Sequence, residues 1–202
     1  MDRTVLSFKG LNQLYKTFQR KTDKPKEEIL RLLQTFKCSR NPDIESFLHD
    51  PNKALEFELR NRSRTYLWLY PKEKQLLVAG YFTLALDVVE LPETLSKSLK
   101  KKLSKGYTEK PFLPAYLIGQ LGRSEDTPKE LLPGELILKK ALEIIEKANS
   151  LVGNRLVIVD VALNKEKDCE GLVTWYKSFG FKELDLIPAG DKKLLRLYLI
   201  LK

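Results

Sequence analysis

The sequence predicts a mixed α/β fold, and three observations carry that prediction. Arg64–Tyr70 and Gln75–Leu86 are rich in aromatic and β-branched residues and flank the polar segment PKEK, a pattern typical of a strand hairpin. A long amphipathic helix after Pro133 leads into the apolar segment Arg155–Leu163, which predicts a buried strand. Two further apolar stretches, FKELDLI and LLRLYLIL, predict a closing pair of strands.

The other segments extend this alternation. Helical periodicity in EEILRLLQTF and on both sides of Pro51 predicts two N-terminal helices, the second one interrupted where proline lacks an amide. The first twenty residues give no clear pattern. Pro111–Leu121 predicts a third strand, and Cys169–Phe179 predicts a short helix that ends at Gly180.

Composition narrows the classes of protein and of site. A chain of 202 residues with 43% hydrophobic content is expected to build one extended domain. No signal peptide and no apolar run of about 18 residues is visible, so we expect a soluble cytoplasmic protein with no membrane partner. Cys38 and Cys169 form no CxxC pair and are accompanied only by His49, so neither a metal site nor a His-dependent nucleophile is expected.

The chain is basic, with a net charge of +9 and a pI near 9.4. Its densest basic segment, SKSLKKKLSKGYTEK, places Lys100, Lys101 and Lys102 on a helix whose Leu95, Leu99 and Leu103 form one apolar stripe. Two interpretations stay open: a solvated helix that covers the core, or a contact with nucleic acid.

WYKSFGF, from Trp175 to Phe181, resembles the last motif of the GNAT superfamily of N-acetyltransferases: Tyr, three variable residues, Gly, Phe. The predicted order of helices and strands over roughly Phe36 to Leu201 also resembles the GNAT layout. Within that layout, FKCSRNPDIESFL, NRSRTYLWL, AGYFTLAL and PAYLIGQLG are similar to segments of the GNAT toxins that acetylate aminoacyl-tRNA.

The resemblance implies a GNAT fold, a mixed and mostly antiparallel central sheet flanked by helices. Residues 36–202 would form the acetyltransferase domain, with residues 1–35 as an N-terminal extension packed on it. It also implies acetyl-CoA as the acyl donor, and Tyr176 as the acid that protonates the departing CoA sulfur. A phenol suits that role because its ordinary pKa of about 10 keeps it protonated at neutral pH.

The pyrophosphate of acetyl-CoA would bind where the third strand leads into the long helix, because a helix N-terminus offers free amides and a positive dipole. On the family's glycine-rich fingerprint, Lys129 matches Gln or Arg, Leu132 the first glycine and Gly134 the second, so one of two glycines is kept. Pro133 has no amide, which leaves as donors the amides of Leu131, Leu132, Gly134, Glu135 and Leu136. The Glu135 carboxylate would have to point away from the phosphates.

By the same resemblance, the backbone of Gln120, Leu121, Gly122 and Arg123 would pair with the pantetheine arm as an added strand does. The Arg123 side chain would either approach a phosphate or stay in solvent.

Two functions remain in competition. The first is an N-acetyltransferase in which a primary amine, of an aminoacyl-tRNA or a protein, attacks acetyl-CoA directly. The second is a noncatalytic GNAT-fold module that binds nucleic acid or a protein partner through its basic face. A homodimer and an antitoxin are the further partners that the resemblance leaves open.

Overall fold

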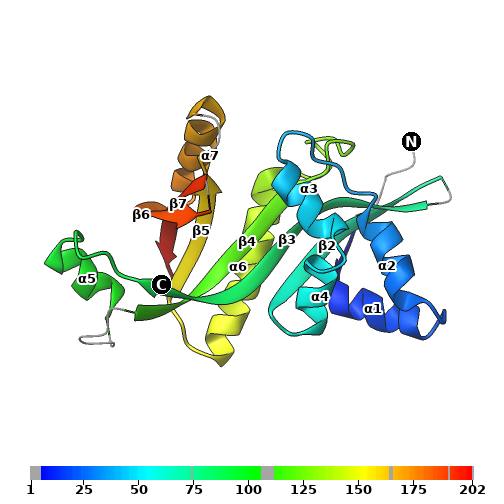
Figure 1. The fold of residues 1–202 in the computed structure, drawn as a ribbon, viewed down its shortest axis with the longest axis horizontal. Coiled ribbons are helices and arrows are strands. Elements are labelled where there is room, and N and C mark those ends of the chain that lie inside the picture. The colour runs from blue at the N-terminus through cyan, green and yellow to red at the C-terminus, as the bar shows by residue number, and fades with distance from the viewer. Residues whose placement is uncertain (1–5, 74, 106–111, 164–165, 191, 202) are drawn as a thin grey trace. The chain divides into compact units, whose positions relative to one another are not determined.

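The structure is a computed structural model that describes residues 6–73, 75–105, 112–163, 166–190 and 192–201. Pro111, the first residue of a predicted strand, lies outside the described residues. The elements in chain order are β1 (Ser7–Gly10), α1 (Leu11–Gln19), α2 (Pro25–Leu33), α3 (Pro42–His49), α4 (Ala54–Leu59), β2 (Ser63–Lys72), β3 (Gln75–Glu90), α5 (Lys97–Leu103), β4 (Phe112–Arg123), α6 (Gly134–Leu151), β5 (Leu156–Ala162), α7 (Glu166–Ser178), β6 (Lys182–Ala189) and β7 (Lys192–Ile200) (Figure 1).

The strands form a seven-stranded sheet in the order β1-β2-β3-β4-β5-β7-β6. β1 with β2, β2 with β3, β5 with β7 and β7 with β6 pair antiparallel, whereas β4 pairs parallel to β5. The parallel pair is the one that α6 connects, as a crossover between parallel strands requires. The predicted mixed, mostly antiparallel sheet is therefore confirmed.

The chain divides into two compact units. Unit 1 comprises Met1–Ala85 with Gly119–Ile144, and unit 2 comprises Leu86–Ile118 with Ile145–Lys202. Because the division cuts β3, β4 and α6, each of these elements contributes to both units. Each unit has its own hydrophobic core and is described by itself.

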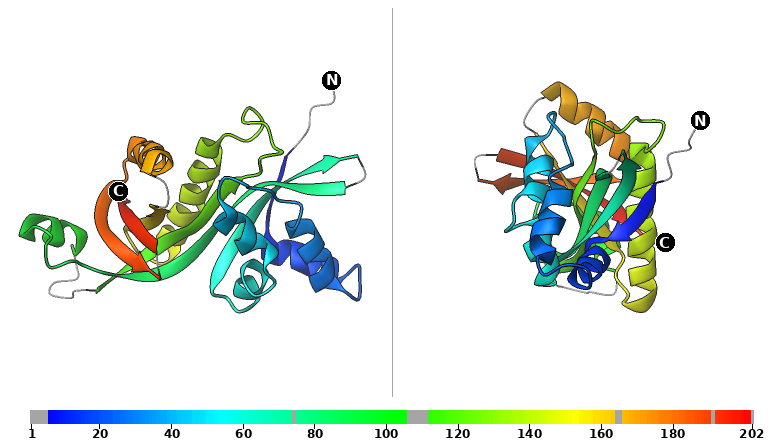
Figure 2. Two further views of the ribbon diagram at one scale, coloured as in Figure 1. Left: turned by 45° about the horizontal axis from the view of Figure 1, so that its top comes forward. Right: turned by 90° about the vertical axis from the view of Figure 1, so that its right-hand side faces the viewer.

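In unit 1, helices α1 to α4 cover one face of the strands and the first turns of α6 lie on the other face (Figure 2). The core under the four helices includes Leu11 from α1, Ile29 from α2 and Leu67 from β2, all 0% exposed. Tyr81 of β3 packs edge to face on Phe36, with 5.0 Å between ring centroids, and its hydroxyl donates to the carbonyl of Ile44 at 2.6 Å. Apolar burial and satisfied polar atoms together fix these helices on the sheet.

In unit 2, Leu95, Leu99 and Leu103 pack on a core formed by residues such as Ile158 and Tyr198. The apolar stripe predicted for the basic helix therefore faces the core, as the spacing of four indicated. Helix α7 packs against β5.

The N-terminal region holds more elements than the two predicted helices. The segment around Pro51 forms two separate helices, because α3 already ends at His49 and α4 begins at Ala54. Before them, β1 is only four residues long, which is too short for a period of two to stand out. The apolar face of α1 is visible in the sequence as Leu11, Leu14, Tyr15 and Phe18, and our prediction missed it.

Candidate active site

Helix α7 ends as the sequence predicts, on a glycine. Gly180 has φ +89°, a left-handed conformation that residues with a Cβ rarely adopt. The amides of Phe179 and Phe181 both donate to the carbonyl of Tyr176, at 3.0 and 3.3 Å, and close the last turn. The backbone of Tyr176 is therefore held in a fixed C-terminal turn.

The side chain of Tyr176 is buried in unit 2, with 4% of its surface exposed. Its ring packs edge to face on Trp175 and on Phe181, with centroid distances of 4.9 and 5.5 Å. Burial raises the pKa of Tyr176 well above its ordinary value, because the phenolate would lose its hydration. The phenol therefore stays protonated at neutral pH, which is the state that a proton donor needs.

In unit 1, the loop between β4 and α6 is organised by its own hydrogen bonds. The amide of Ser124 donates to the carbonyl of Ala79 at 2.8 Å and continues the pairing of the strands. The Arg123 guanidinium donates to the carbonyl of Thr127, four residues along the loop. The side chain thus holds its own loop together in this structure, and its contact with a phosphate stays a prediction.

The start of α6 offers fewer free amides than the sequence suggested. The amides of Leu131 and Leu132 donate to the carbonyl of Pro128, at 3.1 and 3.2 Å, and that of Leu136 donates to Pro133 at 3.0 Å. Gly134 and Glu135 are the first two helical residues, so their amides have no acceptor within the helix. An anion site at this helix would rest on these two amides and on the helix dipole.

The acidic side chain of this first turn is paired along the helix. The Glu135 carboxylate lies 2.5 Å from the Nζ of Lys139, one helical turn further on. An exposed pair of this spacing contributes little to stability, yet it compensates the charge of the carboxylate beside the helix N-terminus.

A buried hydroxyl in the same loop escaped the sequence analysis. Thr127 is 1% exposed, and within the described part of the chain its Oγ1 has no hydrogen-bond partner. Such a hydroxyl can bond a ligand or an ordered water at little cost. Nothing in the local pattern distinguishes Thr127 from an ordinary loop residue.

Two glycines next to this loop leave little room for a Cβ. A Cβ on Gly80 would lie 2.6 Å from Cδ2 of Leu132 and 3.0 Å from the carbonyl oxygen of Gly122, and one on Gly122 would lie 3.0 Å from Cγ2 of Ile44. Leu132 itself is 0% exposed. The residue that replaces the first fingerprint glycine is therefore part of the core of unit 1.

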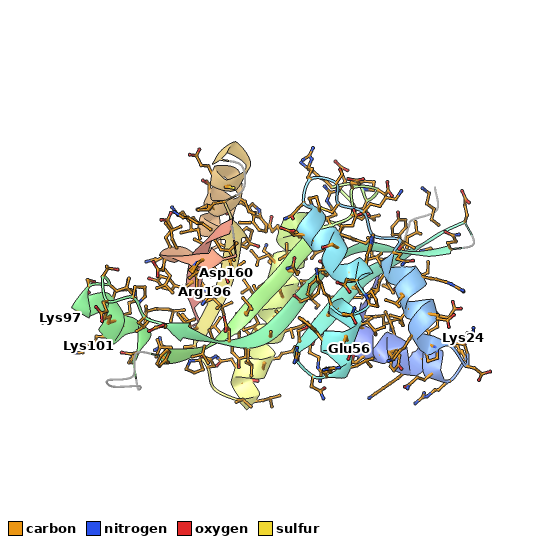
Figure 3. All side chains as sticks on the ribbon, viewed as in Figure 1. Lys24, Glu56, Lys97, Lys101, Asp160 and Arg196 are labelled. Carbon is orange, nitrogen blue, oxygen red and sulfur yellow. The ribbon has the colours of Figure 1, made fainter. Side chains whose placement is uncertain are left out.

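The lysines that were predicted to contact nucleic acid lie on α5 in unit 2. Lys101 and Lys102 are exposed, and Figure 3 shows Lys97 and Lys101 on this helix. The Nζ of Lys100 lies 3.0 Å from the carbonyl oxygen of Glu93 and donates to it. Two of the three predicted lysines thus present their charges freely to solvent.

Comparisons with solved structures identify proteins of similar fold. No protein-family model matches the sequence, and no curated protein matches it. A solved structure of KacT carrying a Tyr-to-Phe substitution superposes with a TM-score of 0.65 at 17% identity, over 98% of this chain and 95% of that one. The structure of AtaT complexed with acetyl-methionyl-tRNAfMet superposes with a TM-score of 0.61 at 23% identity, over 95% of this chain and 94% of that one. A GNAT-family protein from Desulfovibrio desulfuricans superposes with a TM-score of 0.52 at 12% identity, over 97% of this chain and 99% of that one.

The chain has the GNAT fold. Within it, Gln120–Arg123, Leu132 and Gly134–Leu136 belong to unit 1, whereas Tyr176 and the α5 lysines belong to unit 2. The roles assigned to these residues stay predictions. Across the described ranges, no group of three His, Cys, Asp or Glu side chains is arranged to hold a metal ion, and no helix is both long and apolar enough to cross a membrane.

Proposed function

We propose that this protein is an acetyl-CoA-dependent N-acetyltransferase that transfers the acetyl group directly to a primary amine. The observation that carries the proposal is Tyr176, a buried and protonated phenol one turn before Gly180 in a chain with the GNAT fold. Solved structures of both KacT and AtaT include variants in which one Tyr is replaced by Phe. A tyrosine is thus a residue worth testing in proteins of this fold.

Acetyl-CoA supplies a thioester carbonyl that a neutral amine attacks, so that a C–N bond forms and the C–S bond breaks. The phenol of Tyr176 donates its proton to the departing sulfur, and the proton released by the amine restores the phenol. Burial helps this role in one respect, since a phenol that resists ionisation remains a donor at any pH near neutrality.

The residues of unit 1 would hold the donor. The free amides of Gly134 and Glu135 and the dipole of the 18-residue helix α6 suit the pyrophosphate. The Thr127 hydroxyl adds a buried group without a partner among the described residues. The backbone of Gln120–Arg123 would bond the pantetheine arm. With Pro133 lacking an amide and Arg123 bound to Thr127, we expect a weaker phosphate site than the full fingerprint gives.

For the acceptor, we propose the amino group of an aminoacyl-tRNA, with a protein amine as the other candidate. The net charge of +9 favours a polyanion, because lysines that neutralise phosphates release counterions. AtaT has been solved with acetyl-methionyl-tRNAfMet, and also with acetyl-CoA and the C-terminus of the antitoxin AtaR. If this chain acts on the same class of acceptor, an antitoxin is a natural partner for it.

The deciding experiment has two steps. Calorimetry with acetyl-CoA tests donor binding, and a pure protein that releases no heat with acetyl-CoA contradicts the proposal. Incubation with acetyl-labelled CoA and separate pools of charged tRNA, protein and small amines then identifies the acceptor. Label in the tRNA pool supports the leading acceptor, and label in another pool keeps the transferase but replaces its substrate.

A noncatalytic module is the second candidate, and one observation favours it. Few amides are left to bind phosphate, because those of Leu131, Leu132 and Leu136 already donate to carbonyls within the chain. A protein that binds tRNA through α5 but neither binds acetyl-CoA nor transfers label would have this second function.

A further inference from the structure

A pocket of about 310 Å³ lies in unit 1, between the end of α2, the linker to α3 and the loop after β4. At roughly 30 Å³ for each water, it has room for a small organic molecule. Its lining residues are Gln34, Lys37, Cys38, Ser39, Pro42, Glu45, His49 and Glu125. None of these belongs to the residues assigned to acetyl-CoA or to acid catalysis, so the pocket calls for its own explanation.

His49 and Glu45 form one wall and are oriented by the backbone. The Nε2 of His49 lies 2.9 Å from the carbonyl oxygen of Phe36, and since a carbonyl only accepts, Nε2 carries the proton. The other ring nitrogen, Nδ1, lies 3.9 Å from Oε1 of Glu45. Oε2 of Glu45 accepts the amide of Cys38 at 2.6 Å. This wall therefore offers one carboxylate oxygen and, in the neutral ring, one nitrogen as acceptors.

Glu125, from the loop after β4, also lines the pocket and is fixed by Ser39. Its Oε2 accepts both the amide of Ser39 at 2.9 Å and the Ser39 hydroxyl at 2.6 Å. Its own amide donates to the carbonyl of Lys37 at 2.9 Å. The linker and the loop after β4 are thus joined side by side, so both carboxylates of the pocket are held in place before any ligand arrives.

The charged side chains of the pocket suit a cation better than an anion. Lys37 is its one lysine, and the Nζ of Lys37 lies 3.7 Å from Oδ2 of Asp126, outside the pocket lining. The lining thus carries two carboxylates, those of Glu45 and Glu125, against the one ammonium group of Lys37. Over the described residues, no three His, Cys, Asp or Glu side chains come together as metal ligands. Separated acceptors around a cavity of this size suit an organic cation better than a bare ion, because an ammonium group presents three donors in different directions.

We propose that this pocket binds a small organic cation with a primary ammonium group, anchored by Glu45 and Glu125 with the His49 ring as a further acceptor. This ligand site is independent of acetyl transfer, so it stands or falls without acetyl-CoA in the sample.

The single histidine gives the test a clean signal. Because the chain has one His, the imidazole C2 proton of His49 is a single resonance in the NMR spectrum of the untagged protein. n-Butylammonium chloride is titrated at constant ionic strength, and n-butanol serves as the neutral probe of the same shape. We expect a saturable shift with n-butylammonium and none with n-butanol. A response that is equal for both probes, or absent for n-butylammonium, overturns the proposal.

Two variants test the anchors. Glu45→Gln keeps an oxygen for the Cys38 amide and removes only the charge, and it should weaken n-butylammonium binding by about tenfold or more, since a hydrogen bond to a charged group contributes about 1.5–3 kcal/mol. Glu125→Gln, on the exposed rim, should weaken it by a smaller factor without affecting folding. Wild-type affinity in both variants contradicts the assigned site, and circular dichroism confirms that each variant is folded.

Discussion

Arg196 and Asp160 form a bidentate ion pair, with Nε to Oδ1 and Nη2 to Oδ2 both at 2.8 Å (Figure 3). The two residues face each other directly in the register of β7 and β5. Asp87 of β3 adds a second carboxylate 3.2 Å from Nη2. The side chains of Arg196 and Asp160 are only 13% and 17% exposed. One planar guanidinium thus joins three strands of unit 2, which a lysine cannot reproduce because it lacks the forked geometry.

Arg196→Lys should therefore lower the free energy of unfolding by about 1–3 kcal/mol, since two carboxylates would share one point charge in a partly buried setting. Urea denaturation measures the change. Arg31→Lys is the matched control, because Arg31 is 68% exposed and bonds Glu28 at 2.9 Å on the surface of α2. Its effect should stay below about 0.5 kcal/mol. Equal losses in the two variants would show that the geometry at Arg196 is unimportant.

Gly80→Ala should destabilise unit 1 by about 1–3 kcal/mol, because overpacking forces its neighbours to shift. The new Cβ would lie 2.6 Å from Leu132 and 3.0 Å from the backbone oxygen of Gly122, and the backbone oxygen cannot rotate away. Gly171→Ala is the control: a Cβ there meets nothing within 4 Å, and its position inside α7 predicts a gain of up to about 1 kcal/mol. Thermal unfolding of both variants compares the signs, and a stable Gly80→Ala protein contradicts the close packing.

Features that depend on neighbours along the chain were predictable. The aromatic and β-branched pattern of Arg64–Tyr70 gave the first strand of the hairpin, which the structure extends to Ser63–Lys72. The position of Gly180 gave the end of α7 and the place of Tyr176 on its last turn. In each case the signal is a period or a backbone conformation that a short window contains.

Features that depend on distant partners were not predictable. The segment NRSRTYLWL, which contains Arg64 and Thr65, served only as a mark of resemblance. The structure shows that the buried Glu58 accepts Arg64 Nη1 at 2.9 Å and the Thr65 amide at 2.7 Å. The pocket joins His49 to Glu125, which lies far along the chain. Leu132 was aligned with a glycine of the cofactor loop, and only its burial against Gly80 shows that packing occupies this position. No local period encodes such pairings.

Ser39→Ala should raise the pKa of Glu125. The hydrogen bonds of the Ser39 side chain and backbone hold that pKa below its ordinary value, and the variant removes the first of them. A carboxyl whose pKa is lowered on folding stabilises the protein above its unfolded pKa, and this contribution is lost as the pH falls through the folded pKa. Carbon-13 NMR titration of the carboxyl measures the shift. Ser46→Ala, whose hydroxyl bonds Asp43, is the control and should leave the titration of Glu125 unchanged.

Lys101→Glu combined with Lys102→Glu should weaken retention on tRNA if α5 contacts nucleic acid. Each lost phosphate contact reduces the dependence of log K on log salt by about 0.7–0.9, so the loss of two contacts should lower the slope by about 1.4–1.8. Lys24→Glu combined with Lys26→Glu changes the net charge by the same amount on exposed positions of unit 1. Filter binding at several salt concentrations separates a local contact from a general charge effect. Equal losses in the two double variants argue against a contact at α5.

Tyr176→Phe tests the proposed acid directly. The ring keeps its packing on Trp175 and Phe181, so the fold and the affinity for acetyl-CoA should be retained. Turnover should fall by about 10²–10⁴-fold, the range expected when a positioned proton donor is removed. Single-turnover transfer of labelled acetyl measures this, with Tyr15→Phe on α1 as a control that should be fully active. Full turnover in Tyr176→Phe would show that Tyr176 is not the acid that protonates the CoA sulfur.

The wild type and Tyr176→Phe should also differ in stability at alkaline pH. Burial raises the pKa of Tyr176 in the folded protein, while the unfolded chain loses this proton near its ordinary pKa of about 10. Below that pH the folded and unfolded states both keep the proton. Above it the unfolded state is stabilised by ionisation while the folded state keeps the proton. The contribution of Tyr176 to the free energy of unfolding is therefore lost as the pH rises toward the folded pKa. The free energy of unfolding of the wild type should therefore fall faster than that of Tyr176→Phe above about pH 10. Parallel urea curves at neutral and alkaline pH measure this difference, and an identical pH dependence in the two proteins would mean that the phenol is not buried.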